Sequence, residues 1–182
     1  GVIPAIYPSE GTMGTELTIN GSGFGSKKGT VFIGTTALKV LQWNNEFIHA
    51  LLTKPIDPGT YDVTIQPSGP KGTPPIVYED AFVVRPAEIY SVEPGSGTAY
   101  DQVTVKGKFF GAKKGKVYLE YEEGGSLVRK GCKVLSWTMH PTSGDSKIVF
   151  VVPKMLPELC DVVVDPYGAL PETEEEGGFT EK

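Results

Sequence analysis

The stretch Ile6–Ile33, IYPSEGTMGTELTINGSGFGSKKGTVFI, returns later in the chain as Val92–Leu119, VEPGSGTAYDQVTVKGKFFGAKKGKVYL. The two stretches align without a gap at a constant shift of 86 residues, from 6 to 92 and from 33 to 119. The identical positions are mainly glycine, proline and lysine turn residues, with a few apolar ones: Pro8/Pro94, Gly11/Gly97, Thr12/Thr98, Thr18/Thr104, Gly21/Gly107, Phe24/Phe110, Gly25/Gly111, Lys27/Lys113, Lys28/Lys114, Gly29/Gly115 and Val31/Val117. A repeat of this spacing is too long for a solenoid unit and suits a small domain. We therefore expect two copies of one module, residues 1–85 and 86–182.

Working outward from the repeat, alternation of apolar and polar residues predicts short strands throughout the first copy. The expected strands are Leu17–Ile19, Val31–Ile33, Leu38–Trp43, Phe47–Leu52, Tyr61–Ile65 and Phe82–Val84. No window carries a capped helical stripe, and Met155–Pro157 is expected to be a turn at most. About seven short strands in roughly 90 residues, separated by turn residues, predict an all-β fold of two tandem immunoglobulin-like sandwiches.

The second copy differs from the first by insertions. Val134–Trp137 matches Val40–Trp43 at a shift of 94 rather than 86, so residues have been added before it. The addition falls at Tyr121–Lys130, which we expect to be a lengthened hairpin, and His140–Ser146 is expected to widen the next turn. The connection between the copies contains Pro86 and no Gly/Ser spacer, which predicts two sandwiches arranged end to end with limited bending.

These motifs resemble the IPT/TIG family of immunoglobulin-like modules. The residues that carry the resemblance are Pro8, Gly11-Thr12, Gly14-Thr15, Leu17–Ile19, Gly21–Gly25 and Gly59–Ile65. The second copy departs from the pattern, with Tyr100-Asp101 in place of Gly14-Thr15 and Phe109 in place of Gly23. The resemblance implies a β-sandwich in one of several contexts: receptor ectodomains, DNA-binding transcription factors, starch-processing enzymes or bacterial surface arrays. It supports the fold more strongly than any function.

Composition excludes several classes of function. The net charge is −5, with no dense block of lysine and arginine, which argues against a nucleic-acid partner and the transcription-factor context. No apolar run is long enough for membrane insertion. The two histidines, His49 and His140, occupy non-equivalent positions, and no Ser-His-Asp, HExxH or GxSxG pattern or calcium-loop motif is present. We therefore expect no enzyme activity, no cofactor, and no catalytic or metal-binding residues.

Both cysteines, Cys132 and Cys160, lie in the second copy, opposite Leu38 and Tyr61 of the first. They are a candidate disulfide, which would suit an exported protein. The alternative is a pair of buried thiols that act as small apolar residues.

Other patterns have a structural and a functional interpretation. The glycine-rich stretch 21–25 is expected to be a tight corner rather than a phosphate loop, because no helix follows it. The doublets Lys27-Lys28 and Lys113-Lys114 are expected on solvated turns, with contact to an anionic polysaccharide or lipid as the alternative. Trp43 and Trp137 are expected to pack in the sandwiches, and a sugar-stacking surface is the alternative for them and for Tyr7, Tyr78 and Tyr90.

Acidic residues are also interpreted as structural. Asp57, Asp62, Asp161 and Asp165 are expected near strand ends as turn residues, with a calcium site as the alternative. The acidic run 172–176 is expected in a solvated loop before the last strand, with metal or basic-partner binding as the alternative. Asn20-Gly21-Ser22 fits a glycosylation sequon, but its position at a strand end favours a plain turn.

We predict a non-catalytic extracellular or cell-surface module that acts as a rod-like spacer or in adhesion, surface or filament assembly. Its partner would be another protein or a further copy, with polysaccharide as an alternative. The predicted interaction loop is the insertion of the second copy, with Tyr121, Glu122, Glu123, Leu127, Arg129 and Lys130. The second hypothesis is a carbohydrate-binding accessory segment of a polysaccharide-active enzyme.

Overall fold

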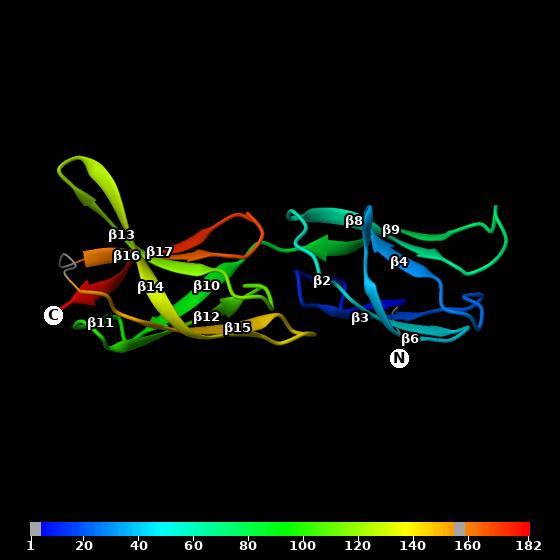
Figure 1. Ribbon diagram of the computed structural model, residues 1–182, viewed down its shortest axis with the longest axis horizontal. Coiled ribbons are helices and arrows are strands. Elements are labelled where there is room, and N and C mark those ends of the chain that lie inside the picture. Colours follow the sequence, from blue (N-terminus) through cyan, green and yellow to red (C-terminus); the bar gives the residue numbers. More distant parts are fainter. Residues whose placement is uncertain (1–4, 155–158) are drawn as a thin grey trace. The chain divides into compact units, whose positions relative to one another are not determined.

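The computed structural model describes residues 5–154 and 159–182, and it contains β-strands with no helix among those residues (Figure 1). The predicted all-β fold is confirmed. The main division of the chain falls between Arg85 and Pro86: one compact unit holds the residues up to Arg85, and the other holds Pro86–His140 and Gly144–Lys182. Each unit is described by itself. Met155–Pro157, the expected turn, lies outside the described residues.

The first unit is a sandwich of two sheets. One sheet has the order β1-β3-β7-β6, and the other has the order β2-β9-β8-β4-β5. The strands are β1 (Ile6–Tyr7), β2 (Glu10–Gly11), β3 (Glu16–Asn20), β4 (Thr30–Ile33), β5 (Thr36–Ala37), β6 (Lys39–Trp43), β7 (Phe47–Leu51), β8 (Gly59–Gln66) and β9 (Ile76–Val84). Sequence alternation predicted the longer strands and missed β1, β2 and β5, because two residues are too few to show a period.

The second unit has the same strand order. Its strands are β10 (Glu88–Glu93), β11 (Ser96–Gly97), β12 (Gln102–Lys108), β13 (Lys116–Glu123), β14 (Ser126–Met139), β15 (Asp145–Val151), β16 (Leu159–Asp165) and β17 (Thr173–Glu181). They follow the order β10-β12-β15-β14-β13-β16-β17-β11. The acidic run 172–176 therefore lies almost wholly inside the last strand, and the expected loop before that strand is wrong.

One strand accounts for the difference between the units. In the first, β5 pairs with β4, the chain passes Leu38, and β6 pairs with β7 in the other sheet. In the second, β14 does both: Ser126–Cys132 pairs with β13, and Lys133–Met139 pairs with β15. The second unit therefore has one continuous strand that passes from one sheet to the other.

Each unit has its own apolar core, formed by the inward side chains of both sheets. The largest fully buried residues are Phe24 and Phe82 in the first unit, and Phe110, Phe150 and Phe179 in the second. Burial of one such side chain contributes roughly 1.5–3 kcal/mol. The cores are therefore the main source of stability in both units.

A tryptophan closes the same corner of each sandwich. Trp43 packs edge-on against Phe24 at 6.4 Å between ring centroids, and its indole N–H donates to the Gly25 carbonyl at 3.0 Å. Trp137 repeats both contacts, with Phe110 at 6.2 Å and with the Gly111 carbonyl at 2.8 Å. The tryptophans are packed against the cores, as the sequence predicted, and the glycine-rich stretch supplies the corner.

An aspartate in the middle of a strand stabilises the same bulge in each unit. Asp62 of β8 accepts a hydrogen bond from the Asp80 N–H at 2.8 Å, and Asp161 of β16 accepts one from the Gly177 N–H at 2.7 Å. Asp80 and Gly177 have positive φ values of 48° and 61°, and the strand pairing shifts register at both places. Asp62 and Asp161 are therefore bulge residues rather than the strand-end residues predicted from the sequence.

The second copy keeps the backbone of the first where it lacks the family's glycines. Tyr100 has φ 71° at the position of Gly14 (φ 103°), and Phe109 has φ 60° at the position of Gly23 (φ 78°). Asp101 also replaces the Thr15 side chain, because each accepts the N–H of the residue three positions earlier at 3.0 Å. The framework therefore tolerates these departures, at a cost of about 1–2 kcal/mol for each left-handed side-chain residue.

Candidate functional site

The most distinctive surface of the second unit is the end of the β13–β14 hairpin. Tyr121, Glu122 and Glu123 pair with Val128, Leu127 and Ser126 around the turn Gly124-Gly125. Both turn glycines have positive φ, 59° and 80°, as a tight hairpin turn requires. This end, residues 121–128, extends beyond the neighbouring strands (Figure 1). We call it the arm. Leu127, near its tip, is 63% exposed.

Arg129 fixes the base of the arm to the sheet. Its Nε donates to Glu120 at 2.5 Å, and its two terminal nitrogens donate to the Glu172 carboxylate at 2.6 and 3.0 Å. The guanidinium also lies over the Tyr118 ring, 5.2 Å from its centroid. Hydrogen bonds to Glu172 and then to Glu120 raise the pKa of Arg129 above its usual value. Arg129, predicted as an interaction residue, therefore holds the hairpin and the acidic strand β17 together.

Three carboxylates gather beside Arg129 on the outer face of this sheet. Glu120, Asp161 and Glu174 have oxygens within 4.8 Å of one another. Glu120 is 7% exposed and accepts from Arg129, while Asp161 accepts from Gly177. Partners within the protein thus account for the two less exposed members of the cluster. The other aspartates of the predicted calcium alternative are not part of this cluster. Asp57 and Asp62 lie in the first unit, and Asp165 lies in the second.

A depression of about 440 Å³ lies where β14 leaves β13. Cys132 is the last residue of β14 to pair with β13, and Lys133 already pairs with Val151 of β15. The two strands therefore diverge there, and Lys114, Lys116, Lys133 and Tyr118 are among the residues that line the opening. Gly131 lies directly opposite Tyr118, and a Cβ added to Gly131 would meet nothing within 4 Å. Space for a ligand is therefore open beside the tyrosine.

A second depression of about 220 Å³ shares Lys114, Gly115 and Lys116 with the first and continues to residues 165–169. Its far side carries Tyr167, which is 40% exposed and has the Lys113 ammonium 4.0 Å from its ring centroid. We call the two adjoining depressions the lysine site. Among the described residues, none of Lys114, Lys116 and Lys133 forms an ion pair.

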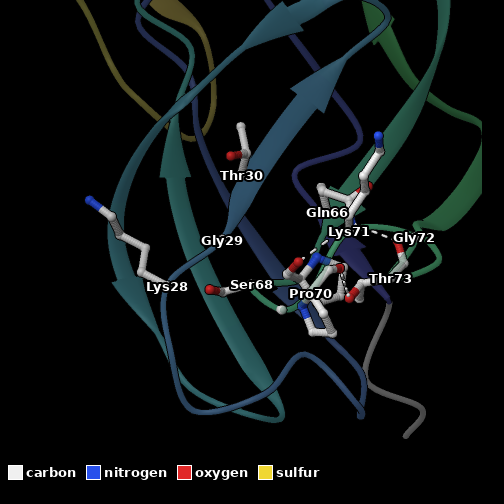
Figure 2. A pocket seen from close by; sticks show the side chains of 11 residues that line it. Lys28, Gly29, Thr30, Gln66, Ser68, Pro70, Lys71, Gly72 and Thr73 are labelled. Carbon is white, nitrogen blue, oxygen red and sulfur yellow. Dashed lines mark hydrogen bonds between the residues drawn. The ribbon is translucent and has the colours of Figure 1, made fainter.

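The first unit has a related corner, shown in Figure 2, where a depression of about 420 Å³ is lined by residues 28–30 and 66–73. Its lining is held by the Thr73 hydroxyl, which donates to the Pro70 carbonyl, and by the Gln66 amide, which donates to the Thr73 carbonyl. Lys28 points away from the other lining side chains. The counterparts of Lys116, Tyr118 and Gly131 are Thr30, Phe32 and Ala37, so this corner lacks Lys116 and the open tyrosine, although Lys71 also lines it.

Both cysteines are thiols in the structure, so the candidate disulfide between Cys132 and Cys160 is not formed. Cys160 is 1% exposed and belongs to the core, and Cys132 packs against that core. Burial raises the pKa of Cys132 to about 12 and that of Cys160 to about 11. Both groups are therefore protonated at neutral pH, as small apolar residues would require.

The other predicted candidates are dispersed over the molecule. His49 contacts Glu16 at 3.3 Å in the first unit, while His140 follows β14 in the second. Tyr7 and Tyr90 are each 57% exposed, but Tyr78 packs against the first core. Sequence reasoning gave contact with an anionic polysaccharide or lipid as the alternative for Lys113-Lys114, but it missed Lys116, Lys133 and Tyr118, because only the divergence of β14 from β13 brings Lys114 and Lys133 together. The sequence did contain one signal for this site: the second copy has Lys116, Tyr118 and Gly131 where the first has Thr30, Phe32 and Ala37.

Comparison with known proteins agrees with this framework. Residues 2–79 match the model of the IPT/TIG domain. A cyclomaltodextrin glucanotransferase of Geobacillus stearothermophilus is 40% identical over 67 residues, which are 37% of this chain and 9% of the enzyme.

Among solved structures, the extracellular region of plexin A4 superposes with a TM-score of 0.51 at 17% identity, and covers 99% of this chain and 18% of the plexin. The similarity to a surface glycan-binding protein, SGBP-B, of Bacteroides uniformis is weaker, with a TM-score of 0.42 at 18% identity over 98% of this chain and 50% of that protein. The plexin similarity supports the fold alone. The chain therefore contains an IPT/TIG domain, its first unit, and its second unit is built on the same framework.

Proposed function

We propose that this chain is a non-catalytic accessory segment of an extracellular or cell-surface protein, and that it binds polysaccharide through its second unit. The observation that carries the proposal is the contrast between the units at one place on a shared framework. Only the second unit has the open lysine site, with Tyr118 facing the space left by Gly131. A tyrosine ring beside open space is a surface on which a sugar ring can stack.

Polysaccharide is favoured over other ligands by the glucanotransferase of Geobacillus stearothermophilus. Its name records a glucan substrate, and the similar stretch is a small part of that enzyme. A segment of this size in such a protein suits an accessory role, in which binding keeps a larger partner on its substrate.

The chemistry of the described residues supports binding rather than catalysis. The thiols of Cys132 and Cys160 have raised pKa values, which leaves little thiolate to act as a nucleophile. Of the three clustered carboxylates, Glu120 accepts from Arg129 and Asp161 accepts from the Gly177 N–H, so two of them have structural partners.

The test is retention of the full chain on polysaccharides, measured together with hydrolysis and transfer products. We expect the chain to migrate more slowly through native gels that contain a bound polysaccharide, with no reducing sugar released and no change in chain length. Unchanged migration with every polysaccharide would overturn the proposal, and so would the release of products.

A second candidate function is docking of a protein strand on the arm, as in surface or filament assembly. It is favoured by the β14 edge, where residues 126–132 pair with β13 on one side and with no other strand among the described residues. Such an edge, next to the exposed Leu127, can accept a strand from a partner.

The arm can be shortened without disturbing its base. Removal of the paired residues Glu122, Glu123, Ser126 and Leu127 keeps the Gly124-Gly125 turn, the strand register and Arg129. If the arm docks a partner strand, the shortened chain loses self-association or partner capture at unchanged thermal stability. Equal association by the shortened and original chains would exclude this candidate.

A further inference from the structure

We infer that the lysine site holds an acidic polysaccharide, with sugar rings against Tyr118 and with carboxylate or sulfate groups against Lys114, Lys116 and Lys133. The inference rests on the proposed function and specifies its ligand class. Its starting point is charge, because these three ammonium groups gather in a chain whose net charge is −5.

The positive charge of the site is only partly balanced by its own lining. The depression at the divergence of β13 and β14 is lined by lysine, glycine, cysteine, valine and tyrosine, with no carboxylate among the lining residues. Asp165, the strand partner of Lys116, lines the adjoining depression. Burial and then the charge of Glu172 raise the pKa of Asp165, while the charges of Arg129 and Lys116 act in the opposite direction. Asp165 therefore offsets part of the charge of Lys116, whereas the depression that contains Lys114 and Lys133 has no carboxylate in its lining. Unpaired ammonium groups around a concave surface favour an anionic ligand.

The shape of the site favours a chain of sugars over a small anion. The two depressions lie on both sides of Lys114–Lys116, and each carries one tyrosine, Tyr118 or Tyr167. Gly131 leaves the space beside Tyr118 free, and Tyr167 is 40% exposed. Aromatic rings on both sides of a row of lysines can contact successive sugars while the lysines contact their acidic groups. Arg129 lies over the Tyr118 ring and the Lys113 ammonium lies over the Tyr167 ring, so a sugar would contact the remaining face or the edge of each tyrosine.

The first unit supplies a natural comparison. It keeps Lys28 and Lys39 at the positions of Lys114 and Lys133, but it has Thr30, Phe32 and Ala37 in place of Lys116, Tyr118 and Gly131. Two lysines on the shared framework are therefore common to both units, and the additions that would make a site are specific to the second. We infer that the first unit lacks this binding.

The experiment measures binding of the full chain by isothermal titration at low and moderate salt. The probes are polygalacturonate, which carries carboxylates, dextran sulfate, which carries sulfates, and neutral dextran. Single-stranded DNA is the fourth probe, because it combines negative charge with flat rings. We expect one or both acidic polysaccharides to bind, with affinity that falls as salt rises, and the comparison between them identifies the acidic group. DNA should bind at least about tenfold more weakly than the acidic polysaccharide.

Two variants and a matched control localise the binding. Lys116→Ser with Lys133→Ser removes two charges from the site, and we expect roughly a thirtyfold loss of affinity. Gly131→Leu changes no charge and fills the space beside Tyr118, for which we expect about a tenfold loss. The control is Lys28→Ser with Lys39→Ser, which removes two exposed lysines at the matching positions of the first unit. It should lose less than about threefold.

The possible outcomes separate the inference from the proposed function. If polysaccharide is bound but both site variants keep full affinity, the lysine site is wrong and the proposed function stands. If no probe and no other polysaccharide binds, the proposed function fails as well. An equal loss in the control, or DNA binding as tight as that of the polysaccharide, would show attraction by charge alone and would overturn the inference. Thermal melting of each variant checks that the fold is intact.

Discussion

The first unit passes from one sheet to the other through two short strands, β5 and β6, whereas the second makes the same passage with the single 14-residue strand β14. Three features of the second unit are on or beside this path: the arm before the crossing, Arg129 at its base and the depression where β14 leaves β13. The apolar cores, the tryptophan corners and the aspartate-stabilised bulges are the same in both units. One framework thus accommodates new surface where a strand changes sheets, because an insertion there leaves both cores untouched.

The largest effect should be the same in both units. Phe24→Ala and Phe110→Ala each remove a fully buried ring that also contacts a tryptophan, so each should lower the free energy of unfolding by about 3–5 kcal/mol. Chemical denaturation measures the loss. A difference of more than about 2 kcal/mol between the two variants would show that the corners are not energetically equivalent.

A smaller effect should distinguish the units. Arg129→Ala leaves the buried Glu120 carboxylate without its partner, and we expect a loss of about 2 kcal/mol. Arg85→Ala in the first unit breaks an exposed pair with Glu10 at 2.8 Å, and it should cost less than about 1 kcal/mol. Denaturation of the two variants in parallel measures both. Equal losses would contradict the assignment of Arg129 as the structural tie of the hairpin.

The buried thiols predict an alkaline loss of stability that is specific to the second unit. Their folded pKa values, about 12 for Cys132 and about 11 for Cys160, are raised above the ordinary thiol value. The unfolded chain therefore loses these protons first, so the stabilisation is complete below about pH 9 and falls as pH rises toward the folded values. From pH 8 to 10 we expect a loss of roughly 2–3 kcal/mol from the two thiols together. Cys132→Leu with Cys160→Ala should reduce this slope in denaturation measured across the range, and an unchanged slope would assign it to other groups.

The smallest effect on stability concerns the left-handed backbone conformation that Tyr100 adopts, as Gly14 does in the first unit. Tyr100 is 62% exposed and has φ 71°, so Tyr100→Gly removes left-handed strain while losing little burial. The greater freedom of glycine in the unfolded chain opposes this gain, and we expect a change within about 1 kcal/mol, toward higher stability. Thermal melting detects it. A loss above about 1 kcal/mol would mean that the Tyr100 ring, which has the Lys154 ammonium 5.7 Å from its centroid, contributes more than its exposure indicates.

The repeat in the sequence predicted most of the framework because its shared residues are those that turns and cores demand, as Gly25 and Phe24 illustrate. Three features could not be predicted from the repeat. Asp62 was interpreted as a turn residue because the bulge that it stabilises depends on Asp80, eighteen residues away. Residues 173–176 were assigned to a loop, although they lie in β17, because the pairing of β17 with β16 cannot be inferred from the acidic run itself. The lysine site needs the divergence of β14 from β13, and single-strand alternation contains no information about which sheet a residue joins.

The central claim is that binding resides where the copies differ. Backbone amide shifts in the full chain, followed by NMR during a titration with polygalacturonate or dextran sulfate, test it most directly. We predict that the amides of Gly115, Tyr118 and Gly131 shift, while those of their counterparts Gly29, Phe32 and Ala37 do not. Shifts of similar size at both sets of positions, or shifts confined to the first unit, would contradict the claim.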